Sequence, residues 1–138
     1  MGVSVLQNYN VSFSSYSVRH YEKSFAKKYK THWTHTKVAI TETARHIDMM
    51  LQYQRADLIK AEGDLKLVKL DFAVAGTKIS PKSSGNRAIL VINERLHYVA
   101  ILMLYHKNDV VGNSETVWWM SVVRDNFPEY AAELNLVV

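Results

Sequence analysis

The sequence predicts an α+β domain in which an N-terminal helical hairpin packs on a small twisted antiparallel sheet and a helix closes the chain. Three observations indicate this class. Apolar residues recur at helical spacing between residues 24 and 58, whereas between residues 66 and 105 they alternate with polar residues or form short continuous runs. A capped apolar segment at 114–127 predicts the C-terminal helix. With 138 residues, the chain fits one domain with a buried core.

The N-terminal end gives the weakest signal. Residues 1–15 are rich in Ser, Asn and Val, and they fit either a strand or a partly disordered segment ahead of the domain at 16–138. Residues Ser17–Tyr21 alternate and predict a short strand. Ser24 can then cap a first helix, whose basic face consists of Lys27, Lys28 and Lys30.

A second, longer helix is predicted from about Thr34 to Leu58, with Gly63 as a C-terminal stop signal. Its apolar stripe advances in steps of three, four and seven residues and comprises Trp33, Ile40, Ala44, Ile47, Leu51 and Leu58. The two helices, joined near residues 31–36, form an αα-hairpin.

The hydrophobic period then changes to that of strands. A half-buried strand is predicted by the alternating residues Val68, Leu70, Phe72 and Val74. A loop bounded by Gly76 and Gly85 leads to an apolar strand at 88–92, and a hairpin turn at 93–95 leads into a strand at 96–105. Because this last strand is apolar on both faces, we expect it to be central in the sheet and covered on each side.

Composition and charge exclude several kinds of function. The chain has no cysteine, which rules out disulfides, thiolate catalysis and cysteine-based zinc sites, and is compatible with a reducing cytoplasm. No apolar run is long enough to cross a bilayer, and the start lacks the pattern of a signal peptide. Residues 1–107 hold 16 Lys or Arg against 8 Asp or Glu, whereas residues 108–138 hold one Arg against five acids. The first part favours a polyanionic partner, unless its cations only solubilise the domain.

Other patterns of functional residues are weak. His32 and His35 have a spacing that suits a metal, but His35 and Glu42 lie two helical turns apart, roughly 10 Å, which is too far for one ion. We therefore expect no metal site. The segment from Gly76 to Gly85 lacks the order of a phosphate-binding P-loop, and a strand follows it instead of a helix. The sequence also shows no nucleophile elbow and no carboxylate pair near the apolar strands.

Cationic and titratable side chains gather at the ends of the two apolar strands. In an antiparallel hairpin the start of one strand lies beside the end of the next, and counting outward from the turn pairs Arg87 with a residue near 101–102. The side chains expected at this rim are Arg87, Tyr105, His106 and Lys107, with Lys78 and Lys82 from the overhanging loop. Such a set suits RNA, because cations bind phosphate, an aromatic ring can stack on a base and histidine can transfer a proton. The alternative is that the strands simply end in polar residues where they leave the core.

Two motifs give the chain a resemblance to the RelE/ParE toxin superfamily over about residues 16–112. One is the loop that ends in Gly85-Asn86-Arg87 ahead of an apolar strand. The other is the apolar strand that ends in Tyr105-His106-Lys107-Asn108-Asp109. The order of a helical hairpin followed by these strands is also similar to that family, whose fold is a small α+β domain.

The resemblance implies a cytoplasmic toxin that cleaves mRNA on the ribosome without a metal or cofactor and is held inactive by a cognate antitoxin. In such toxins the ribose 2′-hydroxyl attacks the adjacent phosphate and leaves a cyclic phosphate. By resemblance, the catalytic group comprises Arg87 as the stabiliser of the phosphorane, His106 as an acid or base, Lys107 as a second cation and Tyr105 as a stacking or positioning group. The residues implied in binding the RNA or ribosomal backbone are Lys66, Lys69, Lys78 and Lys82.

The chain departs from the family pattern in two places. Many RNA-cleaving members carry a histidine on the strand that is "LVKLDFAV" here, and many end soon after the last strand. The acidic C-terminal helix of this chain could instead pack across the sheet, engage a partner or shield the basic rim. Two alternatives therefore stay open: a ParE-like topoisomerase inhibitor, and a non-catalytic interaction protein on the same scaffold.

Overall fold

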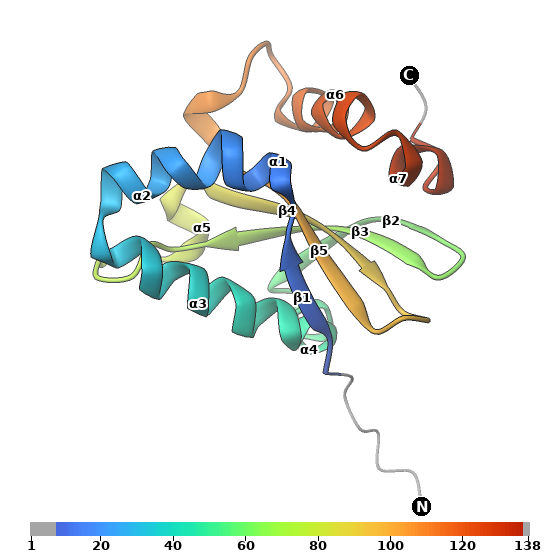
Figure 1. Cartoon of the computed structure of the whole chain (residues 1–138), viewed down its shortest axis with the longest axis horizontal. Helices are drawn as coiled ribbons and strands as arrows, with labels where there is room; N and C mark the ends of the chain where they lie inside the picture. Colours follow the sequence, from blue (N-terminus) through green and yellow to red (C-terminus); the bar gives the residue numbers. More distant parts are fainter. Residues whose placement is uncertain (1–7, 137–138) are drawn as a thin grey trace, which may run out of the picture.

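A computed structural model describes residues 8–136 and has the predicted α+β class (Figure 1). The elements are β1 (Asn10–Phe13), α1 (Ser15–Ser17), the π-helical turn η1 (Val18–Glu22), α2 (Lys23–Tyr29), α3 (Thr31–Arg45), α4 (Ile47–Gln52), β2 (Ala56–Glu62), β3 (Leu65–Phe72), α5 (Pro81–Ser84), β4 (Asn86–Asn93), β5 (Tyr98–His106), the 3₁₀ turn η2 (Lys107–Asp109), α6 (Glu115–Asn126) and α7 (Pro128–Glu133). None of the helices in this described part is long and apolar enough to cross a membrane.

The five strands form one sheet in the order β1-β5-β4-β3-β2. Strands β3 to β5 form the predicted antiparallel meander. β2, which was not predicted, extends it antiparallel to β3, and β1 adds a parallel pair at the β5 edge. The apolar strand β5 lies between β1 and β4, and most of its residues are buried. The expectation that it is central and covered on both sides is confirmed.

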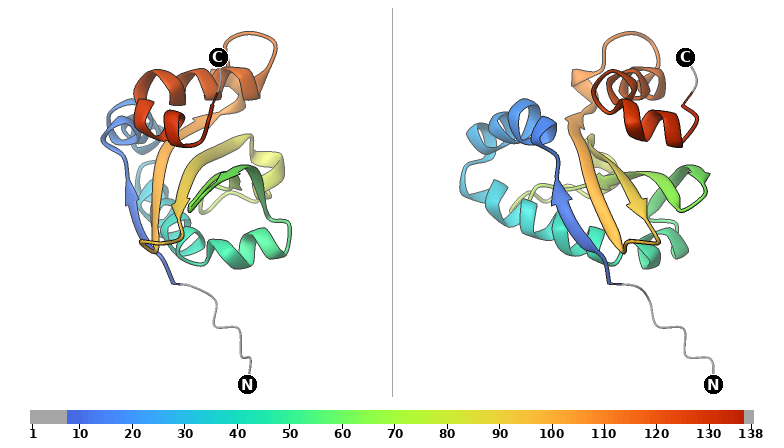
Figure 2. Two further views of the ribbon diagram at one scale, coloured as in Figure 1. Left: turned by 90° about the vertical axis from the view of Figure 1, so that its right-hand side faces the viewer. Right: turned by 45° about the vertical axis from the view of Figure 1, so that its right-hand side comes forward.

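Helices cover both faces of the sheet and create two cores. On one face α2, α3 and α4 bury a first core that includes Phe25, Trp33 and Ile40. On the opposite face α6 and α7 bury a second core around Trp119 and Leu134. Figure 2 shows the sheet between the α3–α4 layer and the C-terminal helices. Because a buried large apolar side chain contributes roughly 1.5–3 kcal/mol, both helical layers are integral to the fold.

The N-terminal prediction is wrong in its details. The segment Ser17–Tyr21 is helical, because Ser14 caps a helix there and its hydroxyl accepts a hydrogen bond from the Ser17 N–H at 2.9 Å. The helix continues to the end of α2, and the hairpin turns at Lys30, whose φ is 52°. The helical hairpin itself is confirmed. Of the segment predicted at 1–15, residues 1–7 lie outside the described residues, and β1 forms within the rest.

The prediction of one long second helix up to Leu58 is also wrong in its second half. α3 ends at Arg45, α4 ends at Gln52, and β2 follows where the prediction still has helix. Leu58, assigned to the apolar stripe, is 51% exposed on β2. Gly63 therefore stops no helix, but lies between β2 and β3 with a φ of 56°. Pairing with β3 determines the structure here, and it overrides the local helical pattern.

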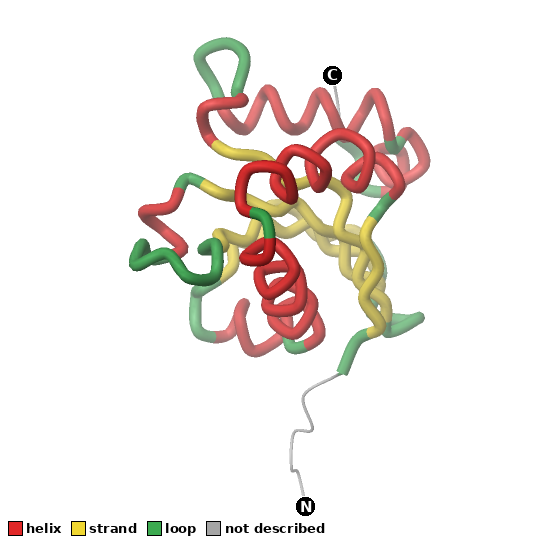
Figure 3. The backbone as a smooth tube through the Cα atoms, turned by 60° about the vertical axis from the view of Figure 1, so that its left-hand side comes forward, coloured by secondary structure: helices red, strands yellow, loops and turns green. Residues whose placement is uncertain are grey.

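The turn between β4 and β5 is longer than predicted. Asn93 pairs with Tyr98, so four residues form the turn, and the register shifts again between Ile89 and Leu90. Arg87 consequently lies opposite Tyr105 and not near residue 101 or 102. Figure 3 shows the segment between β3 and β4 projecting from the end of the sheet as a loop that carries the short helix α5.

Candidate functional site

Five polar side chains meet on the α6 face of the sheet, where β3, β4 and β5 approach their ends. In the strand register Asp71 of β3 lies opposite Arg87 of β4, which in turn lies opposite Tyr105 of β5. Lys69 is two residues before Asp71 and shares its face of β3. Glu115, the first residue of α6, extends to the same place. We call these five residues the rim cluster.

Arg87 is the centre of the rim cluster. Its Nε lies 3.1 Å from Asp71 Oδ1 and 3.8 Å from Glu115 Oε2, and the side chain is only 14% exposed. A second cation, Lys69, places its Nζ 3.7 Å from the same Glu115 oxygen. Burial raises the pKa of the Asp71 carboxyl above its ordinary value, and the nearby charges of Arg87 and Lys69 offset only part of this shift.

Tyr105 is enclosed beneath α6. Its ring is fully buried, and its hydroxyl donates a hydrogen bond to Glu115 Oε2 at 2.6 Å. The ring forms a T-shaped pair with Trp118, with a centroid distance of 5.1 Å. Burial first, and then the bond to Glu115, raises the pKa of the phenol. Tyr105 is thus brought to Arg87 as predicted, but its ring is fully buried and is not open to a stacked base.

His106 is held by local bonds on both ring nitrogens. Nδ1 accepts a hydrogen bond from the Asn108 N–H at 3.0 Å, so the proton lies on Nε2, which contacts the Ser84 carbonyl at 3.1 Å. The ring also packs against Gly85, where an added Cβ would come within 2.7 Å of Nε2. In this arrangement neither nitrogen is free to exchange a proton with a substrate. Lys107, the next residue, is exposed.

The four lysines implied in backbone binding do not form one surface. Lys66 pairs with Glu94 at 3.0 Å and lies on the face of β3 opposite to the rim cluster, because strand side chains alternate. Lys69 belongs to the rim cluster. Lys78 and Lys82 are exposed in the loop between β3 and β4. The roles of these lysines, and those of the predicted catalytic group, stay predictions.

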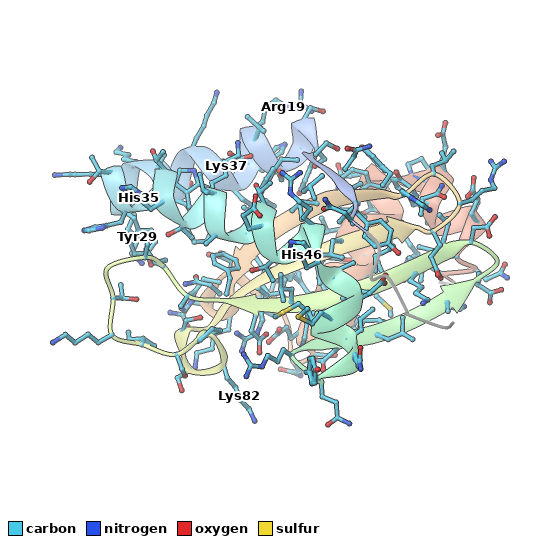
Figure 4. The ribbon with its side chains drawn as sticks, turned by 90° about the horizontal axis from the view of Figure 1, so that it is seen from below. Arg19, Tyr29, His35, Lys37, His46 and Lys82 are labelled. Atoms are coloured by element: carbon cyan, nitrogen blue, oxygen red, sulfur yellow. The ribbon has the colours of Figure 1, made fainter. Side chains whose placement is uncertain are left out.

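An open cleft of about 550 Å³ adjoins the rim cluster. It lies between the end of α4, strands β2 and β3, and α5, and Lys69 and Asp71 form part of its wall. Its other lining residues are Met50, Gln54, Arg55, Asp57, Ser80, Pro81 and Lys82. In Figure 4 the Lys82 side chain extends outward from the molecule.

Three residues of this region were not found by the sequence analysis. Asp71 is a polar position of an alternating strand, and Glu115 follows the Ser114 cap, so both were visible only as ordinary surface acids. Arg55 lay inside the segment wrongly predicted as helix. The expectation that no carboxylate pair lies near the apolar strands is corrected, because Asp71 and Glu115 both contact Arg87 of β4.

Histidines and acids elsewhere do not converge. Figure 4 shows His35 near the start of α3 and His46 at its end. Across the described residues, no three His, Cys, Asp or Glu side chains are grouped so that they could hold a metal ion.

Comparison with known proteins gives one distant similarity. No family model matches this sequence, and no curated protein matches it. A chain of the crystal structure of the archaeal RelE–RelB complex from Pyrococcus horikoshii OT3 is similar in structure, with a TM-score of 0.46 and 15% sequence identity. The similarity covers 73% of this chain and 97% of that chain. At this level of similarity, membership of the family stays a prediction.

Proposed function

We propose that this protein is a RelE-like toxin that cleaves mRNA on the ribosome without a metal, in the cytoplasm, under the control of a cognate antitoxin. The proposal rests on the motif resemblance around Arg87 and Tyr105 and on one structural observation. Arg87 pairs with the carboxyl of Asp71, and Lys69, whose charge also acts on that carboxyl, lines the same open cleft as Asp71. Two cations can stabilise the charge that builds on a phosphate attacked by a neighbouring hydroxyl, and a carboxylate can accept the proton of that hydroxyl.

In the proposed reaction a phosphate of the RNA is bound between Arg87 and Lys69. The 2′-hydroxyl forms a bond to phosphorus as its proton passes to the Asp71 carboxylate. The bond to the 5′-oxygen breaks, and this oxygen takes a proton from water at the open rim, which leaves a 2′,3′-cyclic phosphate. The two cations stabilise the charge that develops on the phosphorane. Asp71 is a better candidate for the general base than His106, because both ring nitrogens of His106 already have hydrogen-bond partners.

The phosphate must compete with Glu115 for the two cations. The contacts of Glu115 with Arg87 and Lys69, at 3.8 Å and 3.7 Å, are longer than hydrogen bonds. An RNA phosphate that replaces these contacts must also accept the hydrogen bond that the Tyr105 hydroxyl donates to Glu115 Oε2. α6 itself need not leave the sheet, where Trp119 anchors it in the second core. The substrate then approaches along the cleft and not across the covered face.

A second candidate function has its own support. Arg87, Lys69 and Tyr105 each already contact a carboxylate, and Tyr105 is fully buried. Such neutralisation favours a non-catalytic interaction protein in which the rim cluster only fixes α6 on the sheet.

Inducible expression in a bacterial host tests the proposal. Wild type is expected to arrest growth and to produce new 5′ ends in ribosome-bound transcripts, mapped by primer extension. Arg87→Ala should abolish both effects. Arg95→Ala is the matched control, because Arg95 also faces an Asp but is 73% exposed at the β4–β5 turn. Unchanged growth and intact transcripts with wild type would favour the interaction protein, and DNA damage with intact transcripts would favour a topoisomerase inhibitor.

A further inference from the structure

The cleft beside the rim cluster contains cations that the fold leaves without an ionic partner. Arg55 and Lys82 are both exposed, and neither takes part in an ion pair among the described residues. They line the cleft from two sides, since Arg55 precedes β2 and Lys82 belongs to α5. Unpaired cations on both sides of a cleft attract an anionic group to its outer part.

The inner wall of the same cleft has the opposite chemistry. Asp57 and Asp71 present carboxylate oxygens, which only accept hydrogen bonds and repel phosphate. Met50 and Pro81 add apolar surface to the lining. A simple anion would use the two cations and leave the carboxylates unsatisfied. A ligand with a phosphate at one end and N–H donors on a flat apolar body at the other would use all of them.

The cleft is also continuous with the rim cluster. Asp71 lines it and pairs with Arg87 at 3.1 Å, and Lys69 lines it while its Nζ approaches Glu115. Asp57 lies directly opposite Lys69 in the β2–β3 register. A chain of cross-strand neighbours therefore leads from Arg87 into the cleft, with opposite residues on one sheet face only about 5 Å apart.

We propose that this cleft binds one nucleotide of single-stranded RNA, next to the phosphate held at Arg87. Arg55 and Lys82 bind the phosphate of that nucleotide, and Asp57 accepts hydrogen bonds from the N–H groups of its base. The volume of about 550 Å³ lies in the range of small-ligand sites. The inference rests on the proposed function for the nature of the polymer, and it adds Arg55 and Asp57 as binding residues.

The test measures binding without cleavage. The probe is a mixed-sequence RNA octanucleotide with 2′-fluoro sugars, which lack the attacking hydroxyl, and a 5′-fluorescein for anisotropy. The full chain is compared with the double variant Arg55→Ala/Lys82→Ala over a series of salt concentrations. The matched control is Arg19→Ala/Lys23→Ala, which removes the same charge from two exposed residues. Figure 4 shows Arg19 and Lys82 on opposite sides of the molecule.

The cleft variant is expected to bind more weakly and to lower the slope of log affinity against log salt by about 1.4, for two lost phosphate contacts. The control variant should keep most of the affinity and of the slope. Equal losses in both double variants, or wild-type binding by the cleft variant, would overturn the inference. Because no cleavage is needed, a chain that loses affinity in the cleft variant but never cuts RNA would refute the endonuclease and leave the cleft standing. A cleft variant that cleaves RNA and binds it with wild-type affinity would refute the cleft inference and support the endonuclease.

Discussion

Asp71 and Arg87 stand directly opposite each other on β3 and β4, and their side chains form an ion pair of 3.1 Å at the mouth of the cleft. The pair is partly buried, with 28% of Asp71 and 14% of Arg87 exposed. Despite this cation, burial leaves the pKa of Asp71 raised. A carboxylate that is more basic than usual, beside a cation that can hold phosphate, is the arrangement on which the proposed chemistry depends.

Asp71→Asn should separate cleavage from binding. The amide cannot take the proton of the 2′-hydroxyl, so we expect the rate of RNA cleavage to fall by roughly 10²- to 10⁴-fold. RNA affinity should stay the same or rise, because a negative charge is removed from the cleft. Single-turnover cleavage and anisotropy measure the two effects. Asp57→Asn makes the same change of charge in the same cleft away from Arg87, and equal cleavage by both variants would eliminate Asp71 as the base.

Glu115→Gln should strengthen RNA binding. The substitution removes the charge that competes for Arg87 and Lys69, while the amide oxygen can still accept the bond from Tyr105. We expect affinity to rise roughly two- to five-fold, as for one partly exposed ion pair. Glu129→Gln, at an exposed residue of α7, makes the same change of charge away from the site. If the two variants gain RNA affinity equally, Glu115 does not compete with RNA for Arg87 and Lys69.

The parts of the fold that could be predicted correctly are determined by residues that are close together in the sequence. β5 was placed at the centre of the sheet because its run is apolar on both faces. The C-terminal helix was predicted from the Ser114 cap, whose hydroxyl accepts from the Val117 N–H at 3.2 Å. The general nearness of Arg87 and Tyr105 followed from the hairpin, although the longer turn and the bulge changed the register.

The parts that were missed depend on contacts between distant residues. β2 carries polar residues such as Asp57 and Lys60 at positions where a pattern cannot distinguish helix from edge strand, and only β3 makes it a strand. Glu115 reaches Arg87 because of the direction in which α6 crosses the sheet, which no local spacing encodes. The same is true of Arg55, whose place in the cleft depends on β2. The cations of the site could thus be predicted from the sequence, whereas its carboxylates could not.

Trp119→Ala should show that α6 is part of the core and not a removable lid. Trp119 is fully buried in the second core, so its truncation is expected to lower the free energy of unfolding by about 3–5 kcal/mol. Val117→Ala, at a residue of the same helix that is 66% exposed, should change it by less than about 0.5 kcal/mol. Urea denaturation gives both values. A tryptophan variant as stable as wild type would mean that α6 contributes little to the fold, and an access route across the sheet would have to be considered.

Alkaline pH should destabilise the protein in a way that depends on Tyr105. Burial raises the pKa values of Tyr9, Tyr21 and Tyr105 above the ordinary value of 10.0, so the folded state keeps phenolic protons that the unfolded state releases. The stabilisation is complete below pH 10 and is lost as the pH rises above it, by up to about 1.4 kcal/mol per pH unit for each phenol. Urea midpoints between pH 8 and pH 11 measure the decline. Tyr105→Phe should be less stable than wild type at pH 8, since it loses the bond to Glu115, yet its stability should fall less steeply above pH 10. Parallel pH profiles for the two proteins would show that the Tyr105 phenol ionises without regard to its burial under α6.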